Sequence, residues 1–245
     1  MSQERNLEEN LLSQAAENTL SSQLDEAETI EVDVQTDLLK IIQGQADAVS
    51  LSGEGLEIQG IRIQEIEVQT DKIAINPLSA IFGQIELNQP VNTTARIILT
   101  EADINHALTS ESIRSKIQNF DLNVDGEIIS LKPQKIQIGL PDDGKIKFHG
   151  TVLIKEKRHT RQIAFTAVVS PRTIDKPILI ESFNCDQGEG ISLDMIVSLM
   201  NKVKELVNLP YFEFDNTKFR LINMEVRKGN MILLVEANVK RIPTL

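Results

Sequence analysis

The chain has 245 residues, of which 41% are hydrophobic, so it can form one large domain or two small ones around a sizeable core. Its net charge of −11 argues against nucleic-acid binding, because clustered lysine and arginine bind a phosphate backbone. The one cysteine, Cys185, excludes an internal disulfide and a paired-cysteine metal site, and the lack of tryptophan argues against recognition of sugars or bases by stacking.

The N-terminal region predicts a helix. Leucine and alanine residues from Leu7 to Leu24 fall on one helical face, so we treat residues 1–27 as an amphipathic segment that precedes a single domain of residues 28–245. The start of the chain carries no charged-then-apolar leader, and no apolar run approaches the roughly 18 residues that span a bilayer. We therefore expect a soluble, cytoplasmic protein whose contact with a membrane is peripheral.

Strands and short helices follow in the next part of the chain. Residues 29–35 alternate as a strand, and residues 38–42 predict a short helix that ends at Gly44. Residues 46–75 then predict strands separated by glycine turns. Leu78–Phe82 predicts a helical turn.

The middle of the chain predicts one strand, two helices and a meander. Residues 91–99 alternate as a strand, and Thr100 with Asp103 forms the start of a helix, since a threonine cap and an acid three residues later can satisfy free backbone N–H groups. Ser110 predicts the cap of a second helix that extends to Phe120. Residues 122–183 read as antiparallel strands joined by polar turns.

The C-terminal region predicts a helix and two strands. The helix starts at Ser192, carries a broad apolar stripe and ends before Pro210. Residues 217–226 and 231–239 form the two strands, and Met231–Val235 is apolar at every position. A strand without polar residues is covered on both faces.

A repeated pattern predicts the fold class. In Ile61–Val68 and in Phe219–Val226, two apolar residues alternate with polar ones, the phase slips by one residue, and the alternation resumes. A similar interruption lies near Pro133 in residues 129–138. Because a bulge bends a strand, these slips predict an α+β fold in which a strongly curved antiparallel sheet wraps amphipathic helices, with internal helix-strand repeats.

Motifs for metal, cofactor or catalytic sites are incomplete. Asp121–Gly126 begins like a calcium loop, but the twelfth position is Lys132 where a glutamate is needed. His106, His149 and His159 have no paired ligand spacing. Nucleophile-elbow, phosphate-loop and dinucleotide motifs do not occur. We therefore expect no catalytic residue, no metal and no cofactor.

A basic cluster interrupts the acidic chain at residues 155–161. On a hairpin, Lys157 and Arg161 share a face, and Arg158 lies at the tip. These three cations could contact a lipid headgroup through charge-assisted hydrogen bonds. The alternative is a solvated turn that discourages aggregation of the sheet edge.

The aliphatic strands and the C-terminal helix suggest an aliphatic interior. Either helix and sheet pack together and fill it, or part of it lines a cavity for acyl chains. The candidate cavity residues lie on the helix, on the strand of residues 163–169 and on the last strand. They are Ile196, Met200, Val203, Phe165, Leu233 and Val235.

One run of residues resembles a known family. Ile98–Leu108, which contains Thr-Glu-Ala-Asp-Ile-Asn, resembles a signature of the LmeA-like phospholipid-binding family. Glu31–Lys40 and Leu51–Leu56 are similar to its cyanobacterial members, and Gly229–Pro243 fits its closing pattern. The resemblance implies a tubular lipid-binding fold, in which curved strands wrap helices around an acyl-chain cavity, with phospholipid binding and no catalysis.

Three functions follow as hypotheses. The first is binding, with transfer, of a phospholipid or another acyl lipid through transient membrane contact and without nucleic acid. The second is a ligand-free interaction or scaffold protein that uses the curved sheet as a docking surface. The third is a lipid hydrolase that uses Cys185 or a histidine beside a buried acid.

Overall fold

A computed structural model of the chain describes residues 7–239, apart from 23, 59, 77–86, 117–119, 158, 188–190, 208–211 and 215–216. The helical turn expected at Leu78–Phe82 lies outside the described residues. The chain divides into two compact units, of which the first holds residues 1–98, 211–222 and 233–245, and the second residues 99–210 and 223–232. The boundary after residue 27 stays a prediction.

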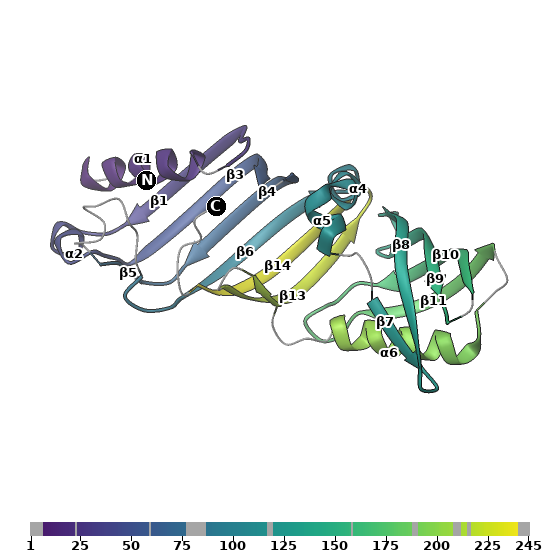
Figure 1. The fold of residues 1–245 in the computed structure, drawn as a ribbon. Helices are drawn as coiled ribbons and strands as arrows, with labels where there is room; N and C mark the ends of the chain where they lie inside the picture. Colours follow the sequence, from purple (N-terminus) through teal and green to yellow (C-terminus); the bar gives the residue numbers. More distant parts are fainter. Residues whose placement is uncertain are drawn as a thin grey trace. The chain divides into compact units, whose positions relative to one another are not determined.

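The first unit is built on a seven-stranded sheet, in the order β1-β3-β4-β6-β14-β13-β12 (Figure 1). Its strands are β1 (Thr29–Gln35), β3 (Ala48–Ile58), β4 (Ile61–Thr70), β6 (Val91–Thr100), β12 (Phe212–Phe214), β13 (Thr217–Arg227) and β14 (Asn230–Val239). The pairs β1–β3, β3–β4 and β4–β6 are antiparallel, as the alternating patterns predict. Strands β6, β13 and β14 carry residues of both units.

Two helices described in the first unit lie toward the β1 end of this sheet (Figure 1). They are α1 (Leu7–Ser21) and α2 (Leu38–Ile42), and a small sheet of β2 (Gln45–Ala46) and β5 (Ile73–Ala74) lies near α2. Asp37 caps α2 by accepting a hydrogen bond from the Lys40 backbone N–H at 3.0 Å. None of the described helices in the chain is long and apolar enough to cross a membrane.

The second unit contains the predicted meander as a five-stranded antiparallel sheet. Its strands, consecutive in sequence, are β7 (Phe120–Val124), β8 (Glu127–Gly139), β9 (Ile146–Lys155), β10 (Thr160–Ser170) and β11 (Leu179–Gln187). The helices described in this unit are α4 (Glu101–Thr109), α5 (Glu111–Lys116) and α6 (Leu193–Val207). The second short helix is therefore shorter than expected, because Phe120 already begins β7 and pairs with Leu131.

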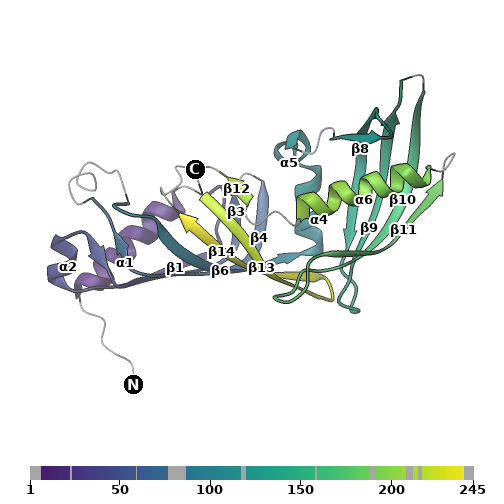
Figure 2. The same cartoon turned by 90° about the horizontal axis from the view of Figure 1, so that it is seen from below.

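The five-stranded sheet curls along α6 (Figure 2). The pairing register shifts between Pro133 and Lys135 on β8, at the interruption that the sequence indicates, and shifts twice more between β10 and β11. Inside the curl, side chains of β7, β8, β9 and β10 form a buried cluster with Met195 of α6. The predicted arrangement of a curved sheet around an amphipathic helix is confirmed in this unit.

Gly150 of β9 lies between Ile136 of β8 and Phe165 of β10, its partners in the two neighbouring strands. A Cβ atom at this position would lie 2.7 Å from the Phe165 ring and 2.9 Å from the Lys135 carbonyl oxygen. We expect Gly150→Ala to lower the free energy of unfolding by about 1–3 kcal/mol, the usual cost of overpacking. Chemical denaturation checks this value. Gly139→Ala is the control, because a Cβ atom at this position would lie 3.7 Å from its nearest neighbour. Gly144 is not suitable as a control, since its φ of 73° would strain any other residue. Equal losses in both variants would contradict the explanation.

Candidate functional site

The Thr100–Leu108 run forms a capped helix. The Thr100 hydroxyl accepts a hydrogen bond from the Asp103 backbone N–H at 3.0 Å and donates to the Asp103 carboxylate at 2.6 Å. Both interactions stabilise the first turn of α4, as the capping pattern predicts. Thr100 and Asp103 therefore support the fold.

Two further residues of the same run attach α4 to β8. The Leu140 backbone N–H donates to Glu101 Oε2 at 2.6 Å. The Asn105 amide donates to the Ile138 carbonyl and accepts from the Ile138 N–H, both at 2.8 Å. Among the described residues, β7 pairs with residues 127–131 of β8. Helix α4 therefore binds the edge of β8 further along the strand, beyond these pairs. The polar residues of this run act in folding.

Helix α1 closes the outer edge of β1 in a similar way. Every second backbone N–H group along this edge donates a hydrogen bond to a side chain of α1, and the acceptors are four residues apart on the helix. Val32 donates to Glu17 at 3.0 Å, Val34 to Ser13 at 3.2 Å, and Thr36, just after β1, to Glu9 at 3.3 Å. Four helical residues rise about 6.0 Å and two strand residues about 6.6 Å, so the two spacings match. Polar side chains thus cover the edge, and Leu11 of the same helix is 61% exposed.

One face of the seven-stranded sheet is aliphatic. Residues opposite each other in a ladder lie on the same face, and one such row joins Val32, Leu51, Val68 and Ala95. On β14, Asn238 donates to Asn92, which lies on the opposite face, so alternation places Leu233 and Val235 on the aliphatic side. We define the aliphatic face by Ile30, Val32, Val34, Val49, Leu51, Ile66, Val68, Ala95, Ile97, Leu233 and Val235.

The opposite face of this sheet is charged. One of its rows joins Glu31, Ser52, Glu67 and Arg96, and Arg96 forms ion pairs with Glu65 at 2.8 Å and with Glu67 at 3.7 Å. By contrast, the side chains of the aliphatic face are half-buried, except for the buried Val32. The described helices of this unit lie toward the β1 end (Figure 1), so neither of them covers the centre of the aliphatic face.

Four of the predicted cavity residues belong to the second unit. Phe165 packs against the buried cluster and stacks on Phe183, with ring centroids 5.4 Å apart. Ile196 and Met200 are half-buried on α6, and Val203 lies in α6 with a side chain outside the described set. Leu233 and Val235, the other two predicted cavity residues, belong to the first unit.

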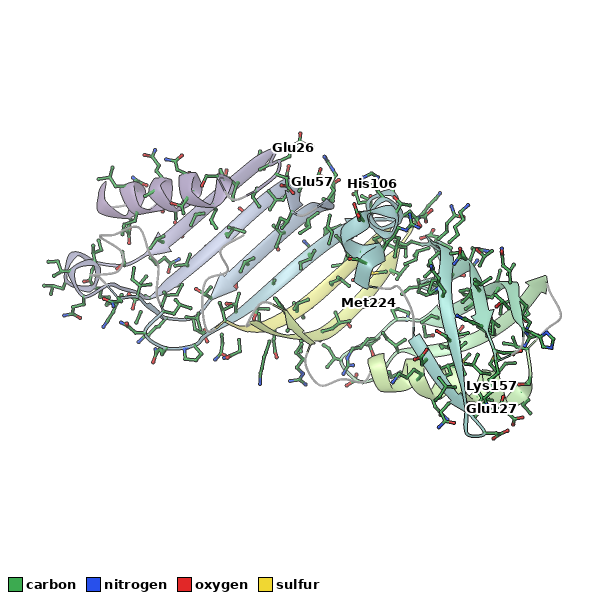
Figure 3. All side chains as sticks on the ribbon, viewed as in Figure 1. Glu26, Glu57, His106, Glu127, Lys157 and Met224 are labelled. Carbon is green, nitrogen blue, oxygen red and sulfur yellow. The ribbon has the colours of Figure 1, made fainter. Side chains whose placement is uncertain are left out.

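The basic hairpin joins β9 to β10. Lys157 forms an ion pair with Glu127 at 2.9 Å (Figure 3), and Arg161 forms one with Glu156 at 3.1 Å. Arg158 lies outside the described residues. Each described cation of the predicted headgroup site thus has a carboxylate beside it.

The calcium-like run forms a tight hairpin between β7 and β8. Asp125 and Gly126 have φ values of 50° and 85°, and the Gly126 N–H donates to Asn123 Oδ1 at 2.9 Å. Such left-handed residues connect two antiparallel strands in a two-residue turn. Across the described residues, histidine, cysteine and carboxylate side chains form no group of three that could hold a metal ion.

Comparison with known proteins identifies one family. The family model described as LmeA-like phospholipid-binding matches residues 5–236, nearly the whole chain. Neither a curated protein nor a solved structure matches the chain.

Proposed function

Since the chain belongs to the LmeA-like phospholipid-binding family, we propose that it binds a phospholipid by laying the acyl chains on the aliphatic face. This proposal is supported by the aliphatic row that runs unbroken from Val32 of β1 to Ala95 of β6, and by the charged character of the opposite face. Leu233 and Val235, two of the residues expected from sequence to contact lipid, belong to this face. Each methylene that leaves water contributes about 0.8 kcal/mol.

We assign the acyl chains to this face rather than to the interior beside α6. Phe165 already stacks on Phe183 and packs against the buried cluster around Met195. An acyl chain there would have to displace packed side chains, which costs free energy. In this proposal Ile196, Met200 and Val203 of α6 do not contact the acyl chains.

The proposed binding leaves the lipid chemically unchanged and permits its transfer between membranes. The defined aliphatic face contains neither cysteine, histidine nor a carboxylate that could attack an ester. A half-buried aliphatic surface also releases its ligand more readily than a closed cavity, because the acyl chains stay close to solvent. The competing function is a scaffold whose aliphatic face docks another protein, and the same openness of this face favours it.

Native mass spectrometry of gently purified protein tests the function. We expect a stoichiometric mass shift that organic extraction resolves into intact phospholipid, because a stable complex leaves the acyl chains buried. Delipidated protein incubated with mixed phospholipid vesicles should regain the same shift. A mass that stays that of the apo chain after this incubation would favour the scaffold, and extracted lysolipid with free fatty acid would favour a hydrolase.

A further inference from the structure

A pocket of about 690 Å³ lies in the second unit, between α4, α5 and the bulge of β8. Its polar lining includes Arg114 of α5 and both Lys132 and Lys135 of β8, and its apolar lining includes Leu108 and Ile136. We propose that this pocket binds a phosphate group, supplied either by a phospholipid headgroup or by a soluble phosphate. The headgroup source rests on the proposed function, whereas the phosphate site itself does not.

The bulge of β8 brings the two lysines to one side of the sheet. In a regular strand, positions three apart face opposite sides. Here Lys132 pairs with Leu153 and Lys135 with Thr151, because the register shifts between Pro133 and Lys135. Leu153 and Thr151 are two residues apart and share a face, so both lysines share it too. Proline is tolerated at such a bulge, since it has no N–H to offer to the ladder.

The cations of this pocket differ in their partners from three other described cations. Arg96, Lys157 and Arg161 each form an ion pair with a carboxylate. Within the part of the chain that the structure describes, Arg114, Lys132 and Lys135 form no ion pair. In a chain of net charge −11, three exposed cations without such a partner around one pocket favour an external anion.

The remaining lining fits a phosphate diester. Among the described lining residues, Glu111 is the acidic one, so the three cations and this one anion carry a net charge of +2 for binding phosphate. The planar guanidinium of Arg114 can donate two hydrogen bonds to phosphate oxygens, while the lysines act as point charges. Leu108 and Ile136 can contact the glycerol carbons beside the phosphate.

The test compares two variants that lose the same charge in the intact chain. Lys132→Gln with Lys135→Gln alters the pocket, and Lys176→Gln with Lys228→Gln removes two exposed cations outside its lining. Binding is measured to inorganic phosphate, and to vesicles that carry either phosphatidylglycerol or diacylglycerol with the same acyl chains. Two exposed charge pairs with the phosphate are lost, so we expect the pocket variant to bind inorganic phosphate about tenfold more weakly. The control variant should bind like the wild type.

The three ligands separate the possible sources. Weaker binding of both inorganic phosphate and phosphatidylglycerol, with unchanged binding of diacylglycerol, identifies the pocket as a headgroup site. Weaker binding of inorganic phosphate alone identifies a site for soluble phosphate. Equal affinities of the pocket variant and the control variant would overturn the phosphate site. A wild-type protein that binds inorganic phosphate but neither lipid would instead count against the proposed function and leave the phosphate site in place.

Discussion

Val235→Asp is expected to weaken phospholipid binding by more than about tenfold, which corresponds to at least about 1.4 kcal/mol. The reason is that an ionised carboxylate on the aliphatic face would have to lose its hydration when methylenes cover it, and no cation of that face can pair with it. Val235 is half-buried on β14, so an aspartate at this position stays partly in water while the lipid is absent. The variant should therefore fold and still fail to hold lipid.

Leu234→Asp is the matched control for this prediction. It lies on the same strand, is also half-buried, and introduces the same side chain on the opposite face. Native mass spectrometry after incubation with vesicles should find lipid on Leu234→Asp and none on Val235→Asp, with similar thermal unfolding of the two. If both variants lose lipid equally while both stay folded, the acyl chains do not lie on the aliphatic face.

Local patterns in the sequence predict much of the fold. Thr100 and Asp103 cap α4 because a capping box depends only on residues within one turn. The interruption at Pro133 coincides with the bulge of β8, since a proline in a strand has few other places. The alternation of apolar and polar residues in β4 likewise indicates a strand with two different faces.

The candidate surfaces depend on contacts between distant parts of the chain. The aliphatic face requires the register of β1, β3, β4 and β6, and alternation within one strand does not say which faces of different strands coincide. The division into two units is equally hidden, because β6, β13 and β14 contribute to both. The phosphate pocket combines the bulge of β8 with Arg114 of α5, and no spacing in the sequence connects them.

The attachment of α1 to the edge of β1 explains why a polar residue of this helix is buried. Ser13 is 2% exposed although it is polar, because its hydroxyl accepts the Val34 N–H. A hydrophobic stripe predicts that a helix packs on the face of a sheet. Hydrogen-bond acceptors at every fourth residue of α1 instead bind the free backbone N–H groups at the edge of β1. Such acceptors, read together with the stripe, are the signal that would have found this arrangement.

Asn105→Ala should therefore destabilise the second unit by about 2–4 kcal/mol. The substitution leaves both the N–H and the carbonyl of Ile138 without their partner, and each unsatisfied half-buried group costs about 1–3 kcal/mol, less where water can replace the amide. Asn105 also donates to the Glu101 carbonyl at 2.9 Å, so the helix loses an internal contact as well.

His106→Ala is the control. It removes the neighbouring side chain, which is exposed (Figure 3), and should change stability by less than about 0.5 kcal/mol. Urea denaturation of the two variants measures the difference. If Asn105→Ala unfolds at the same urea concentration as His106→Ala, the Asn105 amide does not hold α4 against β8.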